Sequence, residues 1–313
     1  MTAIPSSRRV LTISFLVDVL DVVSNLAVAL LTGSAVVFAE MAQGVADSMG
    51  SALLVIGERR SRRPHDSDHP LGYAREAFFW VLLSAVAMLV IGAGLSAWRG
   101  YQQLVDPSPL GTPLLAIAVV GLAVLTNSYA VSLSLRKLVA ENGNLSGALR
   151  NMDQPLVKSA LLRDSIGTFT SIIGLVALTL YWSFDLIIFD ALGALTAAVM
   201  MVGASLALMT QARALITGQA LPDETLEQLR ATVLGTPGVE AVNRLAAVYS
   251  GESQVLLDAD LDLADGLDTG QIEALLDLLE ARVRDVVPDL ERVRVILNSP
   301  DKHGRAARIK RQT

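Results

Sequence analysis

The sequence has no cysteine and few charged residues, and each shortage excludes a class of protein. Without cysteine the chain can form no disulfide scaffold, no thiolate metal site and no cysteine nucleophile. Charged residues make up 18% of the 313 residues, whereas an ordinary soluble domain carries about 25%. The formal net charge of −6 leaves no excess of basic residues, and a nucleic-acid-binding protein needs a basic face. We therefore expect no nucleic-acid partner.

Apolar residues dominate the first two thirds of the chain. The hydrophobic fraction is 52% and the mean hydropathy is +0.49, which is too apolar for a disordered chain. Residues 1–213 hold 14 basic and 14 acidic side chains, whereas residues 214–313 hold 11 and 17. The sequence thus predicts a membrane domain over 1–213, an acidic soluble domain over 214–300 and a disordered basic tail over 301–313.

The membrane domain contains six apolar segments long enough to cross a lipid bilayer, which takes about 20 residues. They are 10–32, 34–57, 77–98, 112–135, 155–181 and 184–209. The first is too long and too acidic for a cleaved signal peptide. Arginine and lysine gather before the first segment, between the second and third, and between the fourth and fifth, and these residues favour the cytoplasmic side. We expect a six-helix, multi-pass protein of the cell membrane with both termini in the cytoplasm.

The soluble domain has the pattern of a small ferredoxin-like α+β fold on the cytoplasmic side. Helices are expected from Asp223 to about Leu234 and, as an amphipathic segment, from Thr269 to Val286. Strands are expected at Val239–Val248, Val255–Leu263 and Val293–Leu297, with a hairpin between the first two. The predicted order is helix, strand, strand, helix, strand.

Asp47 and Asp164 are the most informative polar residues in the predicted spans, where a charged side chain is costly and marks a path or a site. Asp47 lies ten residues before the inner end of the second span at Gly57, and Asp164 lies nine residues after Pro155 at the start of the fifth. At about 1.5 Å per residue, both acids lie near the middle of the membrane. Because two unpaired buried carboxylates repel each other, we expect a divalent cation or a proton between them.

Other oxygen donors share the faces of these two acids or lie on the fourth span. They are Glu40, Gln43, Thr168, Ser171, Asn127 and Ser128. Glu40, Gln43 and Asp47 follow the spacing of one helical stripe, with Glu40 nearer the outer mouth.

Simpler roles for the acids stay open. Asp164 could pair with Arg163, although neighbours on a helix point about 100° apart, and Arg163 is long enough to reach the cytoplasmic interface. Asp47 could be a structural acid that is hydrogen-bonded across helices. Asp18 and Asp21 in the first span have no evident partner, so a role in lining a path or packing helices is expected for them.

Three stretches resemble the cation diffusion facilitator family. The second span from Thr32 to Ser48 is similar to that family's Gly-Ser…Ala-Glu-x-x-His-Ser-x-x-Asp stretch, and the loop His69–Arg75 is similar to its His-Pro-x-Gly-Tyr-x-Arg signature. Leu161–Ser165 is similar to the Leu-Leu-Glu-Asp-Ser of the branch related to animal zinc transporter nine. The resemblance extends to about Pro300.

This resemblance implies a homodimer that exports divalent metal from the cytoplasm in exchange for protons and pairs its tail domains. In the family, the transport site combines ligands from spans two and five, and Asp47 and Asp164 match its two acids. Gln43 stands where His or Asp is usual, and Ala160 stands where a ligand is usual.

The altered ligand set changes the metal that fits best. All three histidines, His65, His69 and His303, fall outside the spans, so no imidazole can reach the site. Oxygen donors suit harder ions such as Mn²⁺ or Mg²⁺ better than Zn²⁺. Proton exchange then falls to the carboxylates.

Two clusters outside the spans are further candidates. The inner loop holds a candidate second metal site, whose alternative is a polar loop at the membrane edge with a His-Pro that caps the next helix. Its members are His65, Asp66, Asp68 and His69. Asp258, Asp260 and Asp262 alternate along one strand and predict a solvated sheet face, with cation sensing or a dimer contact as alternatives.

The sequence therefore predicts a secondary active transporter of divalent cations in the lipid bilayer, with zinc, manganese and iron all open. Its expected metal ligands are Asp47, Asp164 and Gln43, with Glu40, Thr168 and Asn127 as weaker candidates. The alternative is a non-transporting membrane scaffold or regulator whose degenerate site no longer moves metal. An enzyme with a cofactor is not expected, because no nucleophile–base pair and no glycine-rich phosphate loop is visible.

Overall fold

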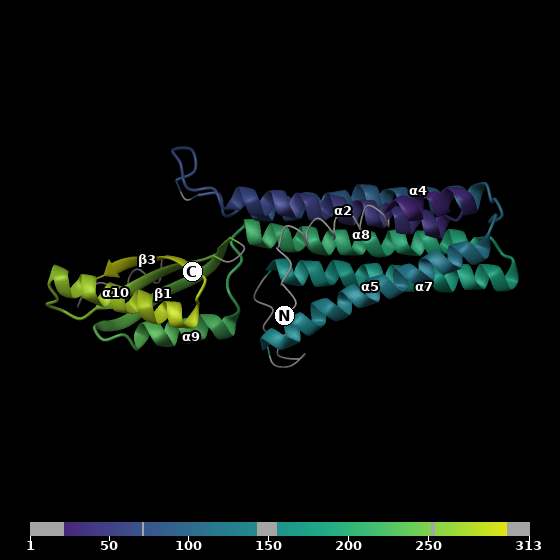
Figure 1. Cartoon of the computed structure of the whole chain (residues 1–313). Helices are drawn as coiled ribbons and strands as arrows, with labels where there is room; N and C mark the ends of the chain where they lie inside the picture. The colour runs from purple at the N-terminus through teal and green to yellow at the C-terminus, as the bar shows by residue number, and fades with distance from the viewer. Residues whose placement is uncertain (1–21, 71, 143–154, 252–253, 299–313) are drawn as a thin grey trace, which may run out of the picture. The chain divides into compact units, whose positions relative to one another are not determined.

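The protein is described from a computed structural model that covers residues 22–70, 72–142, 155–251 and 254–298. Within the helices, the side chains of 133–134, 137–138, 140–142 and 155–164 are not described. The chain divides into two compact units, residues 1–213 and 214–313, whose elements are labelled in Figure 1.

Long helices make up the first unit. Its described elements are the helix Val22–Thr32, α2 (Ala35–Ser61), α3 (Glu76–Ala87), the π-helix η1 (Met88–Ala93), α4 (Gly94–Val105), α5 (Pro113–Asn142), α7 (Pro155–Phe184) and α8 (Ile188–Ile216). This unit is the helical membrane domain that the apolar segments predicted.

Four described helices are long and apolar enough to cross a membrane. They are Glu76–Val105, Pro113–Ser132, Ser165–Phe184 and Ile188–Ile216. Helix α2 has 27 residues, but Glu40, Gln43 and Asp47 lower its hydropathy. Most of the first predicted span lies outside the described residues, so the count of six spans stays a prediction.

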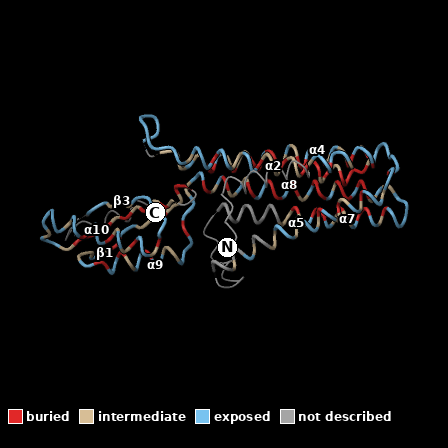
Figure 2. Tube along the Cα trace, viewed as in Figure 1, coloured by how far each residue is buried: buried red, intermediate tan, exposed pale blue. Residues whose placement is uncertain are grey.

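Small residues allow the helices to approach one another closely. A β-carbon on Gly193 of α8 would lie 2.6 Å from Val36 Cγ2 of α2 and 2.6 Å from Ala177 Cβ of α7. No side chain fits at such distances, so α2, α7 and α8 meet at this glycine, as is common in membrane bundles. Figure 2 shows the buried residues along the inward faces of these helices.

The third apolar segment contains a π-helical turn that its sequence does not signal. Helices α3 and α4 continue through η1, so the segment is helical from Glu76 to Val105 and not only over the predicted 77–98. A β-carbon on Gly92 would lie 2.9 Å from Met201 Sδ and 3.4 Å from Ala46 Cβ. The π-turn thus packs against α2 next to Asp47, and such turns are frequent at functional sites.

The second unit is the predicted α+β domain. Its elements are α9 (Asp223–Leu234), β1 (Val239–Gly251), β2 (Gln254–Leu263), α10 (Thr269–Val286) and β3 (Leu290–Asn298). The sheet order is β1-β2-β3, with β1 and β2 antiparallel and β2 and β3 parallel. The predicted element order is confirmed.

The central strand β2 organises the core of this domain. Leu257, Ala259 and Leu261 are fully buried against the helices, as their alternation predicted. On the opposite face Asp258 and Asp260 are half-buried, whereas Asp262 is only 5% exposed, so the prediction of a solvated row of acids is wrong at Asp262. Asn243 Nδ2 donates to Oδ1 of Asp260 at 3.2 Å and to Oδ1 of Asp262 at 3.1 Å. Strands pair with both edges of β2 at all three acids, and the Asn243 side chain lies against Asp260 and Asp262.

Candidate metal site

A chain of polar contacts joins three membrane helices. The fully buried Ser171 of α7 donates its hydroxyl hydrogen to Glu40 Oε2 of α2 at 3.0 Å. Asn127 of α5 donates from Nδ2 to Ser171 Oγ at 2.9 Å. Because one hydroxyl can donate one hydrogen and accept others, Ser171 connects the amide to the carboxylate. The structure therefore brings together Glu40, Ser171 and Asn127, which the sequence had marked as oxygen donors.

Gln43 makes the second contact between α2 and α7. Its side chain is 6% exposed, and its Oε1 lies 2.8 Å from the hydroxyl oxygen of Thr170, which donates to it. Its Nε2 reaches Gly167, where a β-carbon would lie only 2.9 Å away. Sequence reasoning pointed to Thr168, which is half-buried in α7, and missed Thr170. No sequence signal separates these two threonines, since only the partner on α2 does so.

The contacts also give the register of α2 against α7. Val36 meets Gly174 and Glu40 meets Ser171, so the two helices run antiparallel. Asp47 lies seven residues after Glu40, and Asp164 lies seven residues before Ser171. At about 1.5 Å per residue these steps match, so backbone position 164 lies at about the same level along the helix axes as Asp47. The Asp164 side chain lies outside the described set, and Asp47 is half-buried.

Asp190 of α8 binds the first turn of α2. Its carboxylate is fully buried and accepts hydrogen bonds from Ser34 Oγ at 2.6 Å, Ala35 N at 2.7 Å and Val36 N at 3.2 Å. At the same end, Arg99 Nη2 of α4 donates to the Gly33 carbonyl oxygen at 2.7 Å. The predicted sixth span has two acids near its start, Asp185 and Asp190. The partners of Asp190 lie 154 to 156 residues away and were not predictable from the sequence.

The inner loop is organised by Asp66. Its Oδ1 accepts from the backbone N–H of His69 at 2.8 Å and of Asp68 at 3.1 Å, and its Oδ2 accepts from the Tyr73 hydroxyl at 2.6 Å. The Tyr73 hydroxyl and, next, the His69 N–H hold the pKa of Asp66 below its usual range, and the same contact raises the pKa of Tyr73. Asp66 thus stabilises the turn of the loop through these hydrogen bonds.

The His-Pro of this loop does not cap the next helix, which corrects the sequence expectation. Helix α3 begins after Arg75, and no side chain caps it. Among the described residues there is also no group of three or more His, Cys, Asp or Glu side chains placed to hold a metal. This geometry therefore gives no support to a second metal site in the inner loop.

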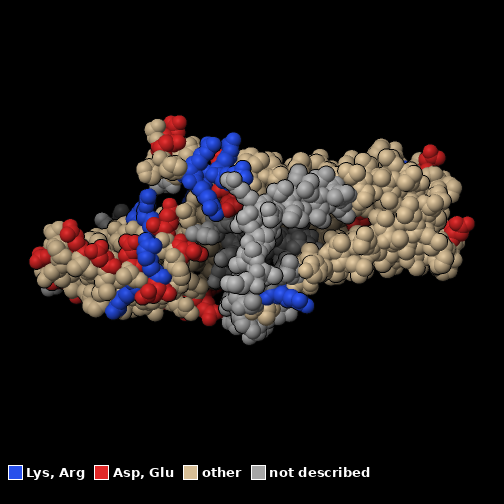
Figure 3. All heavy atoms as spheres, in the orientation of Figure 1, with Lys and Arg blue, Asp and Glu red and all other residues tan. Residues whose placement is uncertain are grey.

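Basic side chains mark one end of the helical unit (Figure 3). Arg59, Arg60, Arg62 and Arg63 are exposed at and just beyond the end of α2. Arg60 lies over the Trp80 ring, with its Cζ 5.5 Å from the ring centre. An aromatic residue beside cations is typical of a membrane–water boundary.

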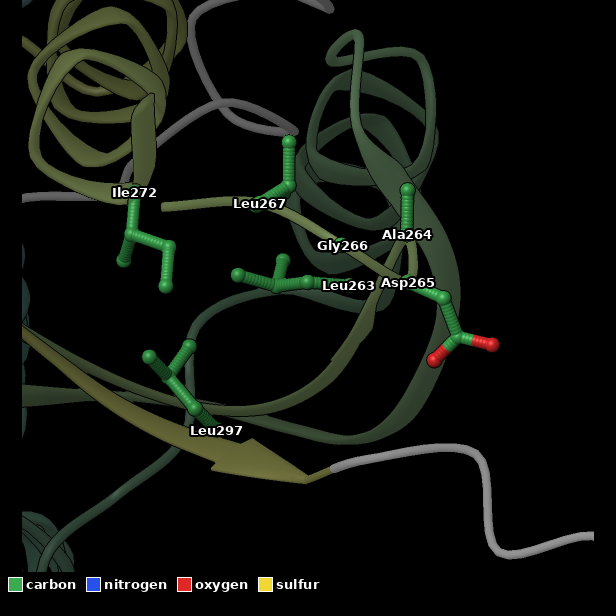
Figure 4. A pocket seen from close by; sticks show the side chains of 7 residues that line it. All are labelled: Leu263, Ala264, Asp265, Gly266, Leu267, Ile272 and Leu297. Carbon is green, nitrogen blue, oxygen red and sulfur yellow. The ribbon is translucent and has the colours of Figure 1, made fainter. Parts of the chain in front are cut away.

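A pocket in the C-terminal domain is apolar. It has a volume of about 270 Å³ and lies between the end of β2 and the start of α10. Figure 4 shows Leu263, Ile272 and Leu297 around it, with the Asp265 carboxylate pointing away. Such a lining offers no donor set for a metal ion.

Comparisons with known proteins identify both units. Residues 11–216 match the family described as cation efflux transmembrane domain, and residues 221–296 match the cation efflux protein cytoplasmic domain. The chain is 26% identical over 243 residues to the proton-coupled zinc antiporter SLC30A9, mitochondrial, of Xenopus laevis, which covers 74% of this chain but 42% of that relative. It thus spans less than half the length of such relatives.

Two further relatives come from other kingdoms. The cation-efflux pump FieF of Cronobacter sakazakii is 25% identical over 258 residues, covering 82% of this chain and 81% of the pump. The metal tolerance protein C4 of Arabidopsis thaliana is 25% identical over 235 residues, covering 74% of this chain and 51% of that protein. The chain therefore belongs to the cation efflux family, the cation diffusion facilitators that its motifs resembled, whose members are transporters and not enzymes.

Proposed function

We propose that this protein is a secondary active transporter that moves divalent metal cations out of the cytoplasm in exchange for protons. The metal would bind between α2 and α7, at Asp47, Asp164 and Gln43. The family supports cation transport, and relatives named as a proton-coupled zinc antiporter and as a cation-efflux pump support the exchange and its direction.

The observation that carries this proposal is the register of α2 against α7. The Glu40–Ser171 contact, continued for seven residues in both helices, brings the backbone of residue 164 level with Asp47. Two carboxylates at one level in a membrane core favour a divalent cation, because it removes their mutual repulsion. When the cation leaves, protons can take its place on the same oxygens, which couples the two fluxes.

The proposed ligands influence which metal ion would bind. Two carboxylates and one amide form an oxygen donor set, which suits Mn²⁺ or Mg²⁺ better than Zn²⁺. The relatives named as zinc antiporters favour Zn²⁺ instead. A comparison of several metals is therefore part of the test.

Orientation and assembly follow as further parts of the proposal. The arginines at the end of α2 support a cytoplasmic position for that end and for both termini, because basic residues favour the cytoplasmic side. The C-terminal domain matches the cytoplasmic domain of cation efflux proteins, and we propose that it pairs with a second copy, since most homo-oligomers are two-fold symmetric. The relatives named as mitochondrial leave the choice of membrane to experiment.

A non-transporting scaffold is the second candidate, and one contact favours it. The Thr170 hydroxyl donates to Gln43 Oε1, the atom that would bind metal, so one of the two lone pairs of that oxygen is engaged. Together with Ala160, which replaces a usual ligand, this leaves two strong ligands.

Uptake into proteoliposomes distinguishes these candidates. The wild-type protein is assayed with Zn²⁺, Mn²⁺, Fe²⁺, Co²⁺ and Mg²⁺, with and without an imposed pH gradient. The transporter predicts saturable flux of at least one metal that accelerates when the receiving compartment is acidic. Flux of no metal under either condition would contradict it and leave the scaffold.

A further inference from the structure

Asp190 is a carboxylate at the start of a membrane helix, yet its side chain is 0% exposed. Burial of an acid is tolerated when its oxygens accept strong hydrogen bonds. The partners here are the first free N–H groups of another helix and a hydroxyl, all on α2. A helix N-terminus also carries partial positive charge, which favours an anion.

Helix α2 has an N-cap of its own, in addition to its contact with Asp190. The Ser34 side chain already accepts a hydrogen bond from Val37 N at 3.2 Å, which is the usual N-cap contact. Its hydroxyl hydrogen is then donated to Asp190 Oδ1. Asp190 therefore adds a connection from α8 to a helix start that has its own cap.

The rest of the described contact between α2 and α8 is apolar and close-packed, with Val36 of α2 against Gly193 of α8. Ala35 and Ala39 of α2 form one buried cluster with Ala194 and Ala197 of α8, together with Ala93 and Met201. Methyl groups attract without a preferred direction. Hydrogen bonds to a fixed carboxylate have preferred lengths and angles. The hydrogen bonds of Asp190 therefore give the contact between these helices a preferred axial position.

We propose that Asp190 is a positioning residue that fixes the axial position of α2 against α8, and thereby the height of Glu40, Gln43 and Asp47 against α7. Helix α2 is rigid over this distance, and Asp47 lies twelve residues after Ala35, or about 18 Å along the axis. A slip at the start of α2 therefore moves all three side chains together. The effect on transport rests on the proposed function.

One pair of variants separates positioning from simple capping. Asp190→Ala removes the connection and leaves Ala35 N and Val36 N without their partner. The double variant Asp190→Ala/Ser34→Asp places a carboxylate at the cap of α2 itself, which restores a strong N-cap but no bond to α8. Asp185→Asn is the matched control, because Asp185 is exposed five residues earlier and Asn also tolerates its positive φ of 54°.

Each variant is purified, and its melting temperature and its kcat and KM for metal uptake are measured. We expect Asp190→Ala to melt earlier and to lose at least tenfold in kcat/KM. We expect the double variant to regain the melting temperature while its kcat/KM stays low, and the control to match wild type. Recovery of both properties in the double variant would show a local cap and overturn the proposal.

A second measurement does not depend on transport. Because the chain has no cysteine, the pairs Ala35→Cys/Ala194→Cys and Ala35→Cys/Ala197→Cys can be introduced cleanly and oxidised with iodine in membranes. We expect one of the two pairs to cross-link much faster in the background with Asp190, and the two rates to converge with Asp190→Ala. An unchanged preference would overturn the positioning role, whatever the wild-type flux. Absence of wild-type flux alongside converging rates would contradict the transport function and leave the positioning role supported.

Discussion

Gly167→Ala is a minimal perturbation of the proposed metal site. Gly167 lies in α7 and faces α2 and α5. A β-carbon there would lie 2.9 Å from Gln43 Nε2 and 3.9 Å from Asn127 Nδ2. The first distance is shorter than real contacts of a β-carbon, so the Gln43 amide must move by about 0.5 Å to reach ordinary contact. The end of a glutamine can make such a movement, so the helices themselves stay in place.

The magnitude follows from the contact that is lost. The moved amide loses its 2.8 Å hydrogen bond with Thr170 and its place beside α7, and such a bond contributes about 0.5–1.5 kcal/mol. If Gln43 binds metal through the other lone pair of Oε1 while Thr170 holds the amide in place, loss of this bond weakens metal binding by about 2- to 13-fold. Alanine also favours the helix by about 1 kcal/mol over glycine, so the free energy of unfolding should change little.

The assay compares two Gly→Ala variants in membrane helices. Gly203 of α8 has open space where its β-carbon would be, so Gly203→Ala gains the same helix preference without touching the site. Metal affinity is measured by titration of purified protein, and melting is measured alongside. We expect weaker metal binding for Gly167→Ala alone. Equal metal affinity of the two variants would refute a ligand role for Gln43.

Three further predictions concern other parts of the molecule. Gln43→His should shift the preference towards Zn²⁺ over Mn²⁺, because it adds an imidazole to oxygen donors, and an unchanged order in competitive uptake would place this side chain outside the site. In the inner loop, Tyr73→Phe should raise the pKa of Asp66 towards its ordinary value of 3.8, because the hydroxyl is the main cause that lowers it. The contribution of Asp66 to loop stability is present above that ordinary value and is lost as the pH falls through the lowered pKa, so NMR titration of the carboxyl should show a higher midpoint in the variant. In the C-terminal domain, Leu279→Ala should lower the free energy of unfolding by about 2–5 kcal/mol, since Leu279 is fully buried, whereas the 41%-exposed Leu278 should tolerate alanine; similar denaturant midpoints for both would contradict the core described here.

The C-terminal domain was predictable because its signals are local. Helix α10 spans Thr269 to Val286 as predicted. Asp268 and Gln271 form a reciprocal capping box at its start, and its apolar stripe decides which face is buried. Alternation likewise identified the core face of β2. The burial of Asp262 was missed, because the Asn243 side chain lies against it only in the folded sheet.

The membrane domain was predictable in outline and not in its polar contacts. Apolar length identifies helices, but nothing in the run from Met88 to Ala93 signals a π-turn. Spacing placed Glu40 on a stripe, yet only the folded helices show its contact with Ser171. The partners of Asp190 are distant in the sequence. Pairwise contacts between helices arise from packing, which a single sequence does not encode locally.

The metal-dependent role of Asp47 and Asp164 is the central claim, and one measurement tests it most directly. Wild type, Asp47→Asn, Asp164→Asn and the exposed control Asp185→Asn are reconstituted at equal amounts, and metal uptake is measured with an acidic receiving compartment. Asparagine keeps the shape of aspartate but removes the charge and the proton-binding oxygen. We predict that both site variants lose metal flux while they remain folded, and that the control transports normally. Normal flux in both site variants would contradict it.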